Sequence, residues 1–274
     1  MRRDRNTGSN EYSVCGAYHA ELRMPPTWLP RYFRRLHIVQ EVLSAHLPEE
    51  ASIIDVGGGE GALVEGLVER GFKNIVGVDP YAPFSNGRMV KGDILALPFH
   101  GAAFDAVICL DVLEHVPLHL QLNAARSLER LLKPGGFALV SVPNMAHLKS
   151  RIDFLFKGQP WRNKLRKHPG ELTMLERLQV LREAGLLLAD SVGLHLTLSY
   201  NPTPKGPLGR LISSIMFSVA MPPALCWTVV LLVYKKPRPQ WIGNIPARSR
   251  KWSPLRAALK SYAPPKEDPT SFLT

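Results

Sequence analysis

An acidic residue and three alternating glycines stand at the end of an apolar run in residues 53–61, which read IIDVGGGEG. Glycine accepts a positive φ and lets a ligand approach the backbone without meeting a Cβ atom. Gly57, Gly59 and Gly61 are therefore candidates for a turn that holds a cofactor, and Asp55 lies two residues ahead of the first of them. This combination predicts a ligand-binding turn after a buried strand.

A second carboxylate, Asp79, ends the apolar run 74–79 and is followed by Pro80. Proline stops a central strand because it cannot donate a hydrogen bond to the ladder. A carboxylate at a strand end can accept both hydroxyl protons of a ribose, so Asp79 fits a cofactor that contains adenosine. The glycine turn together with Ala62 also satisfies G-x-G-x-x-A, which makes a nicotinamide dinucleotide (NAD) one alternative.

The elements that must position these residues follow from hydrophobic periodicity. Residues 62–70 carry the apolar stripe of a helix that Gly71 can end, and a second helical pattern runs through Leu122, Leu128 and Leu131. Strands are expected before the glycine turn and at 74–79, 104–110, 137–142, 186–192 and 225–234. The order strand, glycine turn, helix, strand predicts a nucleotide-binding βαβ unit.

The pattern Asp-x-Gly-x-Gly-x-Gly over residues 55–61 resembles the first motif of class I methyltransferases that depend on S-adenosylmethionine (SAM). Three later segments resemble the same family, in the family's order: 91–99, 111–117 (DVLEHVP) and 132–136 (LKPGG). The second of these is similar to the quinone O-methyltransferases. The resemblance covers roughly residues 51–144 and implies an α/β fold, a three-layer Rossmann-like sandwich. Its seven-stranded sheet would be mostly parallel, with an antiparallel last strand beside the fifth.

The resemblance also implies SAM as the cofactor and gives individual residues their roles. The glycine backbone would pack against the methionine and ribose portions, Asp93 would bind the adenine amino group, and Ile94 would cover the adenine ring. The residues expected to bind the cofactor are Asp55, Gly57, Gly59, Gly61, Asp79, Asp93, Ile94 and Leu110. For Asp93, a simple turn-forming role after Gly92 is the alternative.

Methyl transfer from a sulfonium is a one-step displacement, in which positioning supplies much of the rate. A hydroxyl acceptor also benefits from a base that removes its proton. His115 is the first candidate for that base, since it follows the fourth expected strand; packing against the next helix is the alternative. Asn144 and His147, just after the fifth strand, are candidates to contact the acceptor, or else form a strand-end turn.

Asp111, Glu114 and His115 form an acid-x-x-acid-His pattern that resembles the metal-binding stretch of the quinone O-methyltransferases. The first acid is Asp here, where those enzymes usually have Glu. We therefore expect no metal, and keep a magnesium site on these three residues as the alternative.

The chain has 274 residues, and its 34 Lys and Arg against 23 Asp and Glu give a net charge of +11. We expect an N-terminal extension and cover helix over 1–50, a SAM-binding domain over 51–236 with acceptor-side insertions at 151–226, and a basic, irregular tail over 237–274. The apolar face of the cover helix would contain Tyr32, Phe33, Leu36, Ile38, Val39 and Val42. Three widely spaced cysteines are typical of reduced thiols in a cytoplasmic protein.

Residues 211–233 contain no charged side chain, and this length is close to the roughly 20 residues that span a bilayer. Pro222 and Pro223 would break one continuous helix. We favour a proline turn followed by the last strand at 225–234. Membrane attachment through residues 208–233 is the alternative, with an anionic membrane surface as a partner.

The sequence therefore predicts SAM-dependent methyl transfer to a small-molecule or lipid-like acceptor, at oxygen in the first place. Nucleic acid is not favoured as the acceptor, because LDVL at 110–113 replaces the Asn/Asp-Pro-Pro-aromatic motif of amino-group enzymes. A membrane-associated methyltransferase of a lipid or glycan intermediate, an NAD-dependent oxidoreductase and a non-catalytic SAM-fold adaptor are the alternatives.

Overall fold

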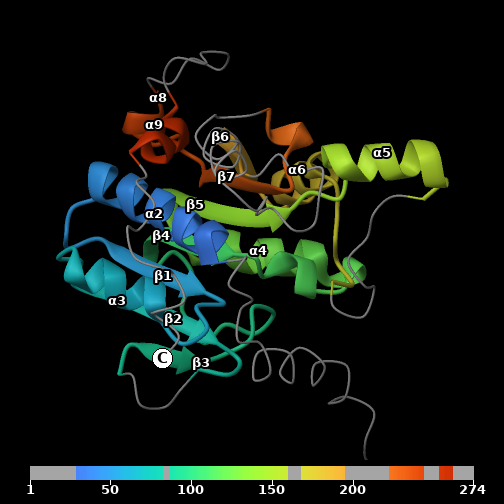
Figure 1. Ribbon diagram of the computed structural model, residues 1–274. Helices are drawn as coiled ribbons and strands as arrows, with labels where there is room; N and C mark the ends of the chain where they lie inside the picture. Colours follow the sequence, from blue (N-terminus) through green and yellow to red (C-terminus); the bar gives the residue numbers. More distant parts are fainter. Residues whose placement is uncertain (1–28, 83–86, 160–167, 195–221, 244–252, 262–274) are drawn as a thin grey trace, which may run out of the picture.

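The computed structural model describes residues 29–82, 87–159, 168–194, 222–243 and 253–261 (Figure 1). Its strands are β1 (Ser52–Val56), β2 (Asn74–Asp79), β3 (Met89–Lys91), β4 (Phe104–Leu110), β5 (Leu132–Pro143), β6 (Leu186–Leu194) and β7 (Thr228–Lys235). Its helices are α2 (Leu29–His46), α3 (Ala62–Glu69), α4 (Gln121–Leu131), α5 (Leu148–Lys157), α6 (Met174–Glu183), α8 (Gln240–Gly243) and α9 (Pro254–Lys260). The expected strands and helices are therefore present.

The strands form one sheet in the order β3-β2-β1-β4-β5-β7-β6. β1, β2, β3, β4 and β5 pair in parallel, whereas β7 is antiparallel to both β5 and β6. The strand order reverses between β1 and β4, which is where ligands bind in open α/β sheets, outside the carboxyl ends of the strands. The seven-stranded sheet with an antiparallel last strand beside the fifth is confirmed.

Alternating side chains of the sheet pack into two separate hydrophobic cores, one on each face. Ile53, Ile108 and Leu139 face the core shared with α2, α3 and α9, and Ile54 and Val107 face the core shared with α4 and α6. Because successive strand residues point to opposite faces, the buried strands separate two helical layers (Figure 1). The three-layer sandwich is confirmed.

The cover helix α2 packs its apolar stripe on the sheet, as expected. Leu36, Ile38, Val39 and Val42 are buried, and Leu43 extends the same stripe. The side chains of Tyr32 and Phe33, which the sequence places on this face, lie outside the described residues.

The apolar run that ends at Val233 contributes a central strand. Residues 228–233 of β7 are fully buried between β5 and β6. The strand begins three residues later than predicted, because a short 3₁₀ turn, Pro223–Leu225, begins at the second proline of the pair. The earlier part of the run, up to residue 221, lies outside the described residues. Within the described parts, no helix is long and apolar enough to cross a membrane.

The prediction of an irregular tail over 237–274 is wrong for two stretches. α8 and α9 both form there, and Leu255 and Leu259 of α9 are buried against α2 and β6. Ser253 caps α9 by accepting the N–H of Arg256 at 3.0 Å, and its hydroxyl donates to Asp190 of β6 at 2.6 Å. The prediction failed because the tail is basic overall, and its short apolar stripe was not recognised in the sequence.

Candidate active site

The predicted cofactor residues lie together at the carboxyl edge of the sheet. Asp55, Asp79 and Leu110 stand at or next to the ends of β1, β2 and β4. The glycine turn lies between β1 and the start of α3, beside the point where the strand order reverses. Parallel strands bring these distant residues to one edge, as the sequence predicts.

Backbone hydrogen bonds fix the glycine turn to β2. The N–H groups of Gly57 and Gly58 donate to the carbonyl oxygen of Val78 at 2.7 and 3.2 Å, and the N–H of Gly59 donates to Oδ2 of Asp79 at 3.0 Å. The φ angles of Gly57, Gly59 and Gly61 are 82°, 56° and 94°. These are left-handed conformations that glycine adopts without penalty, which explains why three glycines alternate here.

The two sides of this turn differ in the space they leave. A Cβ atom added to Gly57 would overlap the side chain of Val112, and one added to Gly58 would lie 2.8 Å from Oδ2 of Asp55. A Cβ added to Gly59 would meet no atom of the described residues within 4 Å. The turn is thus packed against the protein on one side and open on the other, and this open backbone fits the approach of SAM.

The carboxyl groups of Asp55 and Asp79 lie close enough to affect each other. Asp55 is buried, and this burial, together with the negative charge of Asp79, raises the pKa of Asp55 to about 7. A cation bound at this edge favours the ionised form of Asp55, so the sulfonium of SAM is compatible with the acidic pair.

The raised pKa of Asp55 predicts how the stability of the protein depends on pH. Because the folded state holds a proton on Asp55 up to a higher pH than the unfolded state, the free energy of unfolding should fall as the pH rises from about 4 to about 7. A shift from 3.8 to about 7 corresponds to at most about 4 kcal/mol. Asp55→Asn should therefore stabilise the ligand-free protein more at pH 8 than at pH 5, measured by urea unfolding. An equal effect at both pH values would contradict the assignment.

Asp93 and Ile94 follow β3 on the same side of the sheet. Oδ1 of Asp93 accepts the N–H of Leu95 at 2.8 Å, and the backbone of Asp93 bridges to Ala96. The turn-forming role that the sequence left as the alternative is therefore present. Ile94 is buried at this turn, and the adenine-binding roles of both residues stay predictions.

The residue after β4, Asp111, has a strained backbone and two side-chain partners. Its φ is 54°, which is uncommon for a residue with a Cβ atom. Oδ2 lies 2.6 Å from Nη1 of Arg35 in the cover helix, and Oδ1 accepts the hydroxyl of Ser141 in β5 at 2.7 Å. These partners hold the corner that places Val112 against the glycine turn. The sequence analysis gives Arg35 no role, because its partner lies 76 residues further along the chain.

Glu114 is a buried carboxyl group in the 3₁₀ turn Leu113–His115. Burial, followed by the charge of Asp111, raises its pKa well above the ordinary value. Among the described residues, no donor forms a hydrogen bond with its Oε2. The backbone carbonyl of Glu114 accepts the N–H of Gly170 at 2.9 Å, which ties the turn to the segment before α6.

A buried polar pair beneath this turn was not found from the sequence. Arg177 of α6 donates through Nη1 to Gln121 and through Nη2 to the carbonyl of Gly170 at 3.1 Å. Nε2 of Gln121 donates to the carbonyls of Leu113 and Val116, both at 2.6 Å. The pair fixes the turn that carries His115. A glutamine at the start of an otherwise ordinary amphipathic helix gives no signal of this role.

His115 lies half-buried in that turn, at the carboxyl edge of the sheet. Its ring meets the ring of His168 edge to face, with centroids 4.9 Å apart. In the described part of the chain, no group of three or more His, Cys, Asp or Glu side chains could hold a metal ion. The alternative magnesium site on Asp111, Glu114 and His115 is thus not assembled there. Asp111 instead pairs with Arg35.

Asn144 has the structural role at the strand end that the sequence left as the alternative, and its contact with the acceptor stays a prediction. Its Nδ2 donates to the carbonyls of Ala224 and Cys226, and its Oδ1 accepts the N–H groups of Ala146 and Met174, at 3.1 to 3.2 Å. An amide side chain has two hydrogens and two lone pairs. All four are used within the protein, so Asn144 joins β5 to the ends of two other segments.

His147 also has a structural role. Its Nδ1 accepts the N–H of Ser150 and caps α5, while its ring stacks on Trp227 with centroids 4.3 Å apart. Burial, helped by Lys149, lowers the pKa of His147 to about 4. The imidazole is therefore neutral at pH 7 and serves the helix end.

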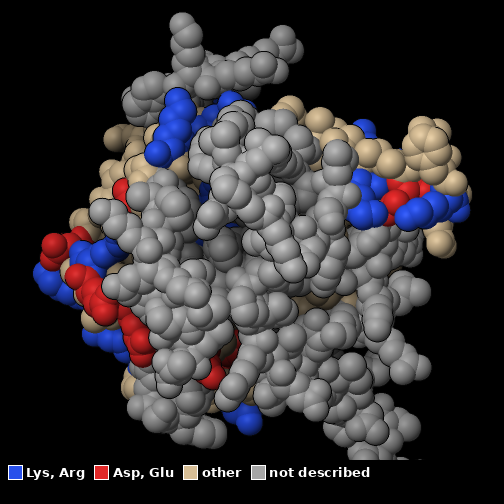
Figure 2. Space-filling view, in the orientation of Figure 1, with Lys and Arg blue, Asp and Glu red and all other residues tan. Residues whose placement is uncertain are grey.

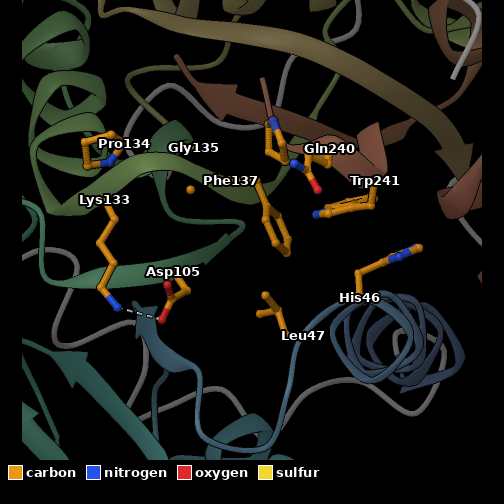
Figure 3. Close-up of a pocket in the computed structure, with 11 residues that line it drawn as sticks. His46, Leu47, Asp105, Lys133, Pro134, Gly135, Phe137, Gln240 and Trp241 are labelled. Atoms are coloured by element: carbon orange, nitrogen blue, oxygen red, sulfur yellow. Dashed lines mark hydrogen bonds and ion pairs between the residues drawn. The ribbon is translucent and has the colours of Figure 1, made fainter. Parts of the chain in front are cut away.

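A pocket of about 310 Å³ opens at the opposite, amino edge of the sheet (Figure 3). Trp241 stacks on His46 at 4.0 Å there, and Lys133 pairs with Asp105 at 2.8 Å. Phe137, where β5 resumes its pairing with β4, forms part of the wall. Since β4 and β5 begin at this edge, the pocket is separate from the predicted cofactor site.

Comparison with known proteins agrees with this geometry. Residues 28–188 match a family described as a methyltransferase domain. A ubiquinone biosynthesis O-methyltransferase of Saccharophagus degradans is 31% identical over 227 residues, covering 72% of this chain and 91% of that protein. A protein of the same name from Marinobacter nauticus is 30% identical over 203 residues, covering 63% of this chain and 79% of its own length.

One solved structure with a similar fold is the 1,6-didemethyltoxoflavin-N1-methyltransferase of Burkholderia thailandensis, which has S-adenosylhomocysteine bound. Its TM-score is 0.54 and its identity 16%, over 86% of this chain and 93% of that one. At this identity the likeness concerns the fold alone.

Proposed function

Because this chain belongs to the family of SAM-dependent methyltransferase domains, we propose that it methylates a hydroxyl oxygen of a small, lipid-like aromatic acceptor. Its relatives are named O-methyltransferases of ubiquinone biosynthesis, and ubiquinone is a lipid-soluble quinone. The observation that carries the proposal is the half-buried His115, which lies on the same sheet edge as the open glycine turn.

The residues of the carboxyl edge would share the binding of SAM. The open backbone around Gly59 would lie against the cofactor, Asp79 would accept the ribose hydroxyl protons, and Asp93 and Ile94 would hold the adenine. SAM supplies a methyl group already activated on a positively charged sulfur. The protein then has to orient the acceptor and remove one proton.

We assign the removal of that proton to His115. An imidazole nitrogen of His115 would accept the proton of the acceptor hydroxyl as the oxygen becomes nucleophilic. The buried Gln121 and Arg177 pair holds its turn from below, and Arg35 and Asp111 hold the start of the turn. His115 would therefore meet the acceptor from a fixed backbone.

His115→Ala should lower kcat about a hundredfold and leave the affinity for SAM unchanged, because general-base catalysis contributes on that order. Methyl transfer from labelled SAM and equilibrium binding of SAM measure the two quantities separately. His119→Ala, at an exposed histidine of the neighbouring 3₁₀ turn Leu118–Leu120, is the matched control and should keep full activity. Equal losses in both variants would remove His115 from the mechanism.

The acceptor class needs its own experiment. Labelled SAM would be offered with a catechol that carries an isoprenoid chain, with the same ring bearing an amine in place of the reacting hydroxyl, and with the catechol without its chain. We expect label in the first compound, none in the second and less in the third. Labelling of the amine alone would overturn oxygen as the acceptor atom. The labelled SAM would also be offered with fractions of a cell extract. If the protein bound SAM but transferred no methyl group to any fraction, the non-catalytic SAM-fold adaptor would be favoured.

A further inference from the structure

Helix α5 buries polar side chains and exposes apolar ones, which is the opposite of the usual arrangement in a surface helix. Ser150 and Asp153 are buried, with 2% and 6% of their surfaces exposed, whereas Leu155 and Phe156 are 76% and 80% exposed. Phe154, on another side of the helix, is 61% exposed. A helix that packs on a protein core normally turns its apolar stripe inward. An exposed apolar cluster of this kind indicates contact with something outside the chain.

The helical repeat gathers these side chains into one stripe. Leu148, Ile152, Leu155 and Phe156 follow the i, i+4, i+7, i+8 spacing of a single helix face. α5 projects from the body of the molecule (Figure 1), and uncharged side chains border a row of alternating charges at its outer end (Figure 2). The apolar stripe is thus carried on a projecting element.

The charged side of α5 is basic. Asp153 is its one acid, and both of its oxygens are taken, by Lys149 at 2.5 Å and by Lys157 at 2.8 Å. These two lysines hold the pKa of Asp153 below its ordinary value. Arg151 is exposed and adds a further positive charge.

The sequence after the helix continues the same bias. Residues 148–167 contain seven Lys and Arg and one Asp, a net charge of +6 out of the +11 of the whole chain. More than half of the excess charge therefore falls on this short stretch. Basic residues beside an apolar helix face are the combination that binds anionic lipid, since the apolar side chains enter the acyl region and the cations meet the headgroups.

We propose that α5 docks this protein on an anionic lipid surface, with Leu155 and Phe156 entering the bilayer and Lys149, Arg151 and Lys157 at the headgroups. A ten-residue helix is about 15 Å long. Its one face is small beside the roughly 800 Å² per partner of a stable protein interface, whereas a bilayer needs no matching groove. Docking goes beyond methyl transfer and does not depend on it.

The test is sedimentation with vesicles in the absence of SAM and acceptor. The full chain should bind vesicles of equal parts phosphatidylglycerol and phosphatidylcholine, bind pure phosphatidylcholine at least tenfold more weakly, and lose affinity as salt rises. Leu155→Glu with Phe156→Glu should weaken binding to the anionic vesicles at least tenfold. Leu175→Glu, at a leucine of α6 that is 78% exposed, is the matched control and should bind normally.

Three results would overturn the proposal: no binding by the full chain, equal losses in the α5 and α6 variants, or binding that is the same with neutral and anionic lipid. If the protein is a dimer in sedimentation velocity and the double α5 variant is a monomer, the apolar face of α5 binds a second copy of the chain instead.

Far-ultraviolet circular dichroism and SAM affinity check that each variant folds. The single variant Leu155→Ser replaces the double variant if the double variant fails to fold. Failure here leaves methyl transfer untouched, because the assay contains no SAM.

Discussion

We expect Asp79→Ala to lower the affinity for SAM about a thousandfold in isothermal titration. Asp79 is only 5% exposed at the end of β2, where its Oδ2 accepts the N–H of Gly59 at 3.0 Å and its Oδ1 accepts the N–H of Tyr81 at 2.8 Å. Its loss would remove a support of the glycine turn together with the proposed acceptor of both ribose hydroxyl protons. Each hydrogen bond to a charged group contributes about 1.5–3 kcal/mol. The loss of the two hydrogen bonds from the ribose hydroxyls to Asp79 therefore corresponds to a fall in SAM affinity of this size.

Asp105→Ala is the matched control for that experiment. Asp105 is a carboxylate in the same sheet, at the start of β4, and it accepts the N–H of Ser52 and pairs with Lys133, both at 2.8 Å. It therefore supports the fold as Asp79 does, but at the edge away from the proposed site. The control should bind SAM normally. Affinity within tenfold of normal in the Asp79 variant would overturn the cofactor assignment.

The sequence predicted the parts of the fold that depend on local chemistry. Pro80 marks the end of β2 to the residue, and Gly71, with a φ of 96°, ends α3 as predicted. The LKPGG segment lies inside β5, which begins five residues earlier than predicted. Leu132 pairs with Phe104 and Phe137 with Ala106, so residues 133–136 bulge out of the ladder. Residue types that restrict φ or remove a donor act on their own neighbours, and so can be recognised in one sequence.

Contacts between distant segments could not be predicted in the same way. Arg35 contacts Asp111, and Arg177 contacts Gln121, only because the sheet brings distant segments of the chain together. The face of a helix follows from its periodicity, but the partner of one polar side chain on that face depends on the packing of another element. Asn144 illustrates this limit, since a strand-end asparagine can equally meet a ligand or brace a loop.

Two glycines of the turn should respond differently to alanine. Gly57→Ala should lower the free energy of unfolding by about 2–4 kcal/mol, because its φ is 82° and its Cβ would overlap Val112. Gly59→Ala should cost only the conformational penalty of about 1–2 kcal/mol at a φ of 56°. Its affinity for SAM should nevertheless fall at least about a hundredfold, because the added methyl group stands on the open side of the turn. Urea unfolding and SAM titration measure the two effects.

Gly158→Ala separates backbone strain from obstruction of the cofactor. Gly158 has a φ of 69° at the end of α5, and within the described parts of the chain a Cβ there would also meet no atom within 4 Å. It should therefore lose about as much stability as Gly59→Ala and keep its affinity for SAM. If Gly59→Ala also kept that affinity, the open side of the turn would not be where SAM lies. Because the two positions share their strain and their free space, only a bound ligand can make them differ.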